Sequence, residues 1–246
     1  MEAWLLLVGA LAGVVSGLLG VGGGIVLTPF LHYVMDQPWG EAVALSLFVI
    51  AVQAPIGVWR HARKGHVDWR LGLLLAAGGA GGVWLGAWLL PRLSVPGLKL
   101  LFALLMAFAA WRLAKPTRLA PTAAAARLPT ALAVGFGAGV VSRILGVGGG
   151  VLTVPSMALL GISVHTAVAS SLVAVFSNAA LATGANLAMG LAWQAGVLLA
   201  VGAVAGTVLG ARIAHSLPAH HLRRAVAAAL ALVGTLVAFD GVRNLL

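Results

Sequence analysis

Long apolar runs limit how this chain can fold more than any other feature of its sequence. Crossing a bilayer as one helix takes about 20 apolar residues, and six runs have about that length: Ala42–Trp59, Trp69–Leu90, Val95–Trp111, Val164–Leu187, Trp193–Ala214 and Leu222–Phe239. Two more, Ala3–Met35 and Leu128–Gly161, are longer and are interrupted by glycines. The runs do not alternate polar and apolar residues as barrel strands do. The sequence therefore predicts an all-α polytopic membrane protein.

The composition supports this class and excludes several others. Charged residues make up 8% of the chain, against roughly 25% in soluble domains, so lipid must cover much of the surface. The absence of cysteine excludes disulfides and thiol chemistry. Basic residues in short loops between spans account for the net charge of +10, so we expect no nucleic-acid partner. The first run has no basic residue before it and no small-residue cleavage site, so we do not expect a removable signal peptide.

The sequence repeats itself at a spacing of about 125 residues. The segment GVVSGLLGVGGG at 13–24 returns as GVVSRILGVGGG at 139–150, and Pro29 recurs as Pro155. Weaker matches follow in the later spans, such as Gly82 with Gly206 and Gly86 with Gly210. We therefore divide the chain into repeat 1 (1–111), a cytoplasmic linker (112–127) and repeat 2 (128–246). Each repeat has one glycine-broken segment followed by three plain spans.

Loop charges predict how the repeats are oriented. Lys and Arg collect in cytoplasmic loops, and eleven of the 15 basic residues lie in three regions: 60–70, the linker, and 212–224. These regions share one side only if each broken segment enters and returns on the same side as two half-helices. Each repeat then has three crossings, so the repeats are inverted relative to each other, as in many transporters. Arg92, Lys99 and Arg243 lie on the opposite side in this arrangement.

The glycine breaks are the first candidates for a binding site. Non-helical backbone is tolerated at membrane depth only where it is buried in protein or lines a polar cavity. A new helix that begins after such a break offers free N–H groups and a positive dipole end, which favour an anion. Close helix packing through small residues is the alternative. Two copies at matching positions favour a site.

Arg143 is the most informative single residue, because it replaces Gly17 of the first repeat and precedes a glycine break. A charge at that depth is costly and normally has a partner or lines a pathway. None of the five acidic residues lies in an obvious span centre. The guanidinium suits an anionic substrate, although an arginine that reaches the membrane interface is the alternative.

Polar residues recur at matching positions and complete the candidate site. Gln53 matches Asn178 in mid-span, and two serine pairs also match; interhelical hydrogen bonding is their competing role. The predicted substrate-binding residues are Arg143, Ser16, Ser142, Gly22, Gly23, Gly24, Gly148, Gly149, Gly150, Gln53, Asn178, Ser46 and Ser171. No catalytic motif or metal-ligand pattern stands in the sequence, so we expect no enzyme activity, metal or cofactor.

The duplicated glycine block followed by a proline resembles the TauE/SafE family, also called the sulfite-exporter or toluenesulfonate-uptake permease (TSUP) family. The resemblance covers both repeats. It implies a transporter of small sulfur-containing anions, such as sulfite, sulfonates or sulfoacetate, in the bacterial plasma membrane. The predicted partners are that anion and the lipid bilayer. A passive anion channel and a non-transporting membrane partner subunit are the alternatives, and the missing acidic residues favour uncoupled, electrogenic export.

Overall fold

The computed structural model describes residues 3–20, 22–114, 128–186, 193–213 and 219–243. Within these ranges the secondary structure is helical, which confirms the predicted fold class. The helices are α1 (Ala3–Leu19), α2 (Gly24–Tyr33), α3 (Trp39–Ala62), α4 (Trp69–Leu89), η1 (Leu90–Arg92), α5 (Val95–Ala114), α6 (Leu128–Leu145), α7 (Gly150–Leu159), α8 (Val164–Asn186), α9 (Trp193–Ile213) and α10 (Ala219–Arg243).

The helices follow the apolar runs closely. Among the described residues, α3, α4, α6, α8 and α9 are long and apolar enough to cross a membrane, and α1 and α5 are shorter apolar helices. The chain is therefore a multi-pass membrane protein. The predicted linker at 112–127 lies mostly outside the described residues, but α5 continues through Ala114, three residues past the boundary expected for repeat 1.

Each glycine-broken segment forms a hairpin whose arms are unequal. The ring of Trp4, near the start of α1, contacts that of Phe30, near the end of α2, with centroids 5.4 Å apart. Gly23 lies against Ala12 in the middle of α1, so α2 runs back along α1. The expectation of two half-helices is correct only for the return arms. With 17 and 18 residues, α1 and α6 are about 25–27 Å long, whereas α2 and α7 have 10 residues each and span about 15 Å.

The two repeats pack on each other reciprocally, with glycines at the contacts. Helix α1 runs parallel to α9, and a Cβ at Gly13 would overlap the carbonyl of Ala203. Helix α6 runs parallel to α4 in the same way, and a Cβ at Gly139 would overlap the carbonyl of Gly79. Only glycine permits so close an approach of two backbones. The repeated glycines therefore hold the halves together as well as breaking the helices.

Helices α3 and α8 form the centre of the molecule. Gly196 and Thr207 of α9 lie beside Leu45 and Gly57 of α3, so these two helices are parallel, and contacts of Gly72 and Gly79 with α8 show that α4 and α8 are parallel. Because α4 reverses direction after α3, α3 and α8 are antiparallel. Equivalent helices of the two repeats thus run in opposite directions along the bundle.

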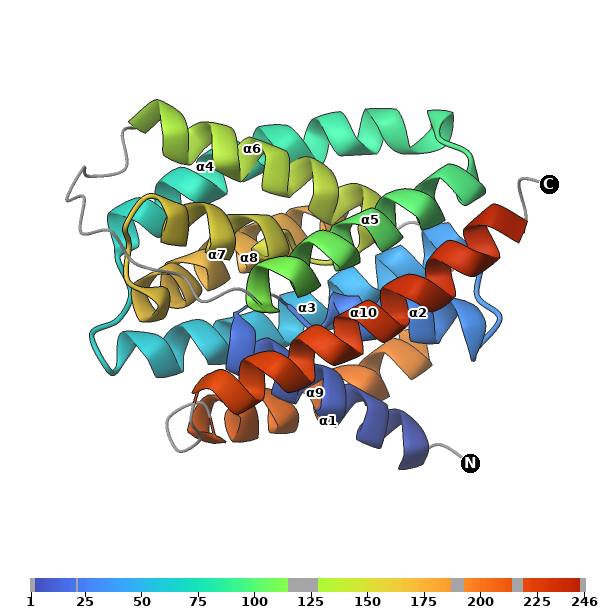
Figure 1. The fold of residues 1–246 in the computed structure, drawn as a ribbon, viewed down its shortest axis with the longest axis horizontal. Coiled ribbons are helices and arrows are strands. Elements are labelled where there is room, and N and C mark those ends of the chain that lie inside the picture. The colour runs from blue at the N-terminus through green and yellow to red at the C-terminus, as the bar shows by residue number, and fades with distance from the viewer. Residues whose placement is uncertain (1–2, 21, 115–127, 187–192, 214–218, 244–246) are drawn as a thin grey trace.

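The two ends of the bundle differ in charge. Arg60, Arg63 and Lys64, at the end of α3, share a cavity with Arg212 at the end of α9. The described ends of the chain, Ala3 and Arg243, lie at the opposite end of the bundle (Figure 1). Helices α5 and α10 pack together across one face. We call the cavity end the basic end and the other end the terminal end.

Candidate functional site

The two glycine breaks meet in the centre of the molecule. A Cβ at Gly22 would lie 3.1 Å from the carbonyl oxygen of Val147, 3.6 Å from Ile50 Cδ1 and 3.6 Å from Val175 Cγ1. A Cβ at Gly148 would meet the same two side chains, at 3.0 Å from Val175 and 3.4 Å from Ile50. Ile50 and Val175 are themselves equivalent by the repeat. The two breaks therefore lie against the same pair of side chains.

Backbone conformation explains why glycine stands at these positions. Gly22, Gly148 and Gly149 have φ angles of +84°, +74° and +84°, in the left-handed region that residues with a Cβ rarely adopt. Gly24 and Gly150 begin α2 and α7, and α2 starts without a side-chain cap. The first N–H groups of a helix have no acceptor within the helix. The breaks thus place backbone donors in the protein interior.

Gln53 of α3 lies beside the first break, and Asn178 of α8, its equivalent in the repeat, packs on Gly79 of α4. Both side chains are 0% exposed. Thr207 donates a hydrogen bond to Gln53 Oε1 at 3.1 Å, but Gln53 Nε2 has no partner among the described residues. That nitrogen lies 3.0 Å from where a Cβ at Gly23 would stand. Neither amide atom of Asn178 has a partner among the described residues. Buried polar groups are normally hydrogen-bonded, so both amides are exceptions within the described part of the chain.

The hydroxyl groups of the predicted site divide into two kinds. Ser46 donates to the carbonyl oxygen of Gly146 at 2.8 Å, and Ser171 exchanges a short hydrogen bond with Thr153. These two serines therefore stabilise the breaks. Ser142 is fully buried, and its hydroxyl has no partner among the described residues. Ser16 is 1% exposed.

Thr28 is a further buried hydroxyl that the sequence did not single out. Its Oγ1 is without a partner in the described part of the chain and lies 2.6 Å from where a Cβ at Gly146 would stand. Thr207, the partner of Gln53, was also missed. Repeat comparison could not find either, because Val154 and Val83 occupy the equivalent positions. Only the packing of α2 and α9 brings them to the breaks.

Arg143 lies closer to the terminal end than the amides do. Its Cβ and Cγ pack on Gly86 of α4, whereas Asn178 packs on Gly79 of the same helix. Seven residues along a helix correspond to about 10 Å. Arg143 Nε is buried without a partner among the described residues, and no contact joins it to Gln53 or Asn178 in that part of the chain. The structure thus places Arg143 nearer the terminal end than Asn178 and not within the amide pair.

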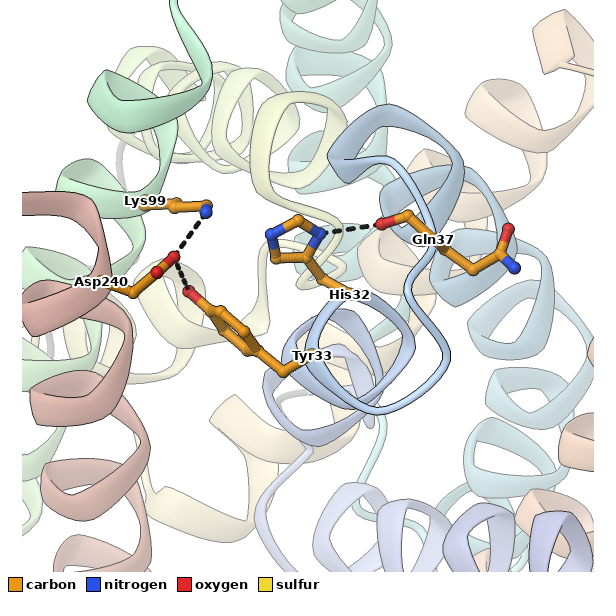
Figure 2. Close-up of polar contacts among 5 residues, drawn as sticks. All are labelled: His32, Tyr33, Gln37, Lys99 and Asp240. Carbon is orange, nitrogen blue, oxygen red and sulfur yellow. Dashed lines mark hydrogen bonds and ion pairs between the residues drawn. The ribbon is translucent and has the colours of Figure 1, made fainter. Parts of the chain in front are cut away.

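A separate polar cluster ties the first hairpin to helices α5 and α10 at the terminal end (Figure 2). Lys99 of α5 donates to Asp240 of α10 at 2.5 Å, and Tyr33 of α2 donates to the same carboxylate at 3.0 Å. His32 bonds the carbonyl oxygen of Gln37 at 2.8 Å. The predicted topology left Lys99 on the side away from most cations. Its pairing with Asp240 neutralises it there.

Comparisons with known proteins agree with this architecture. The family model described as sulfite exporter TauE/SafE matches residues 5–237. A protein of Xylella fastidiosa strain Temecula1 named "Probable membrane transporter protein" is 37% identical over 116 residues, 47% of this chain and 44% of the relative. A protein of Methanocaldococcus jannaschii named "Probable membrane transporter protein MJ0441" is 33% identical over 76 residues, 29% of this chain and 28% of the relative. The chain thus spans less than half the length of these relatives. No solved structure matches it.

Proposed function

Because this chain belongs to the sulfite exporter TauE/SafE family of membrane transporters, we propose that it exports small sulfur-containing anions such as sulfite, sulfonates or sulfoacetate. The anion would bind in the centre, where the glycine breaks meet. The family and its relatives are transporters rather than enzymes, so the proposal concerns which solute moves and how.

The observation that carries this proposal is the pair of equivalent buried amides on the two central helices, one of which, Gln53, lies beside the first break. Gln53 Nε2 and Asn178 Nδ2 are donors without an acceptor among the described residues. The hydroxyls of Thr28 and Ser142 can also donate and are likewise without a partner in that part of the chain. A set of neutral donors around free helix N-termini suits an oxyanion, whose oxygens accept several hydrogen bonds.

Arg143 has a different role in this proposal. Its guanidinium would attract the anion from the terminal side toward the central donors. It would also lower the free-energy cost of removing the anion from water. Replacing Arg143 with Gln should therefore raise the anion concentration needed for half-maximal transport, and Lys should restore it only in part because it lacks the planar fork. Unchanged transport kinetics in a well-folded Arg143→Gln protein would remove Arg143 from the pathway.

We also propose that the repeats are inverted across the membrane, with the basic end in the cytoplasm. The antiparallel directions of α3 and α8 support inversion, and the cations gathered at one end support the orientation. The chain has no native cysteine, so a maleimide can label only a cysteine that is introduced. Arg70→Cys should react with an impermeant maleimide only from the cytoplasm and Gly40→Cys only from outside. Reaction of both from one side would contradict the topology.

Direct transport measurements test the substrate class. Purified protein in liposomes should move radiolabelled sulfite or a sulfonate with a rate that saturates, and unlabelled sulfite should compete. Saturation at millimolar or lower concentration separates a carrier from a passive channel. Absence of flux for sulfite, sulfonates and small carboxylates, with the protein shown to be folded and oriented, would favour the non-transporting subunit.

A further inference from the structure

A cavity of about 330 Å³ opens at the basic end of the molecule. The ends of α3 and α9 form it, and its lining comprises Trp59, Arg60, His61, Arg63, Lys64, Ala211 and Arg212. Four of these seven residues carry a permanent positive charge, and none is acidic. Its volume falls within the range of small-molecule sites, at the lower end.

Membrane topology alone does not explain this convergence. The positive-inside rule requires Lys and Arg in cytoplasmic loops, but it does not require residues far apart in the sequence to face one cavity. Arg60 and Arg212 come from the last turns of two different helices, one in each repeat. Four like charges within one cavity repel each other unless an anion lies among them.

The individual side chains show which cations are available. Arg63 stacks on the ring of Trp59, with its guanidinium carbon 4.6 Å from the ring centroid. Arg60 is half-buried, and its Nε has no hydrogen-bond partner among the described residues. A buried guanidinium N–H without an acceptor is costly. Arg60 therefore brings a buried donor without a partner among the described residues to the cavity wall, and Arg212 adds a second charge from α9.

The internal repeat supplies a comparison within the same molecule. The positions equivalent to Arg60 and Arg212 are Ala185, at the end of α8, and Trp88, at the end of α4. These two positions therefore carry no charge, although Arg92 stacks on the Trp88 ring, with its guanidinium carbon 3.7 Å from the ring centroid. Arg143 is a second cation in this region, because its equivalent Gly17 lies against Ala211, a residue of the cavity wall. The two regions are thus related by the repeat but differ in the number of their charges.

From this convergence, we propose that the basic-end cavity is a second anion site, which binds a small oxyanion through Arg60 and Arg212 before it reaches the centre. The site is separate from the central donors, since Arg60 lies two helical turns from Gln53 on α3, about 10 Å along its axis. A free anion or the phosphate of an anionic lipid headgroup could supply this chemistry. As an entry site for the transported anion, it rests on the proposed function; as an anion site, it does not.

Binding of sulfate to purified full-length protein tests this inference. The probe is sodium sulfate, titrated in neutral detergent by calorimetry, with sodium gluconate holding the ionic strength constant. Charge-assisted hydrogen bonds contribute about 1.5–3 kcal/mol each, so Arg60→Gln with Arg212→Gln should weaken sulfate binding at least roughly tenfold. The matched control, Arg92→Gln with Arg243→Gln, removes the same charge from the terminal end and should leave the affinity unchanged.

Further arms separate the possible outcomes. Asn178→Leu, which removes a central donor, should still bind sulfate at the basic end even if it no longer transports, so failure of the central site is distinguishable from failure of this one. In nanodiscs, phosphatidylglycerol in place of phosphatidylcholine should leave sulfate affinity unchanged if the occupant is a free anion, and should weaken it by competition if the occupant is a headgroup. Equal sulfate affinity in wild type, the Arg60/Arg212 variant and the Arg92/Arg243 control, with all three melting at the same temperature, would overturn the proposal. So would the absence of any sulfate binding by wild type together with no effect of phosphatidylglycerol on its melting temperature.

Discussion

Replacing Asn178 with Leu should stabilise the protein and abolish transport at the same time. Asn178 is fully buried, and neither of its amide atoms has a partner among the described residues. A buried polar group left unsatisfied costs about 1–3 kcal/mol. Leu has a similar shape and no polar atoms, so Asn178→Leu should remove this cost without leaving a cavity.

The magnitude follows from the two unsatisfied atoms and from the size of the chain. We expect the free energy of unfolding to rise by about 1–3 kcal/mol, and each kcal/mol raises the melting temperature of a chain this long by roughly 2–4 °C. Transport should fall to background because the leucine offers no donor to the anion. The assays are thermal unfolding in detergent, followed by intrinsic fluorescence, and sulfite flux in liposomes.

Ser46→Ala provides a matched contrast at the same break. Ser46 satisfies the carbonyl of Gly146, so its removal should lower the stability by about 1 kcal/mol while leaving the anion donors in place. Two results would refute the reasoning about Asn178. Lower stability of Asn178→Leu would mean that the amide has a structural role, and normal flux would mean that the anion does not meet it.

Three further predictions concern other parts of the chain. Gly149→Ala should abolish transport and lower the free energy of unfolding by at least about 1–2 kcal/mol. Gly149 has a φ of +84°, and the new Cβ would lie 2.6 Å from the carbonyl oxygen of Ala138. In the same thermal-unfolding assay, Gly137→Ala should be neutral or stabilising, because its Cβ would meet nothing within 4 Å. Asp240→Asn should lower the free energy of unfolding by about 1–3 kcal/mol, because it leaves the Lys99 charge without its partner. The loss should be smaller than for a fully buried pair, since the Asp240 side chain is 31% exposed and that of Lys99 is 7% exposed. Adding Lys99→Met removes the unpaired charge and should recover most of the loss. Anion flux in liposomes should follow an imposed membrane potential and persist without a sodium or proton gradient, since an exported anion gains about 2.3 kcal/mol per charge per 100 mV; dependence on either gradient would indicate coupled transport.

The fold was predictable where a local pattern determines it. Apolar runs bounded by charges located α3, α4, α8 and α9 to within a few residues, because lipid forces each span to satisfy its own backbone. The repeated glycines also predicted where the helices break. The unequal arms of the hairpins were not predictable, since the position of Gly23 beside Ala12 depends on how α2 packs against α1.

The candidate site was predictable only in part, for a related reason. Comparing the repeats identified Gln53 and Asn178, because both copies retained a polar residue. It could not identify Thr28 or Thr207, whose equivalents are apolar. It also placed Arg143 beside the break by sequence distance alone, whereas its Cβ and Cγ pack on Gly86 of α4, nearer the terminal end than Gly79, where Asn178 packs. Side chains that are close in sequence project in different directions from a helix, so spacing along the chain is a poor measure of distance within the site.

The distribution of charge along the proposed path suits transport better than a charged centre would. A fixed arginine among the central donors would bind an anion tightly in a medium of low dielectric and slow its release. In this molecule the guanidinium groups lie away from the centre, with Arg143 toward the terminal end and Arg60 and Arg212 at the basic end, and the proposed central donors are neutral. Neutral donors gain less from the anion and let it leave toward either end. The larger charge at the basic end would concentrate anions there, and an inside-negative potential would then drive them outward. On the proposed path, this difference in charge between the two repeats would favour export over import.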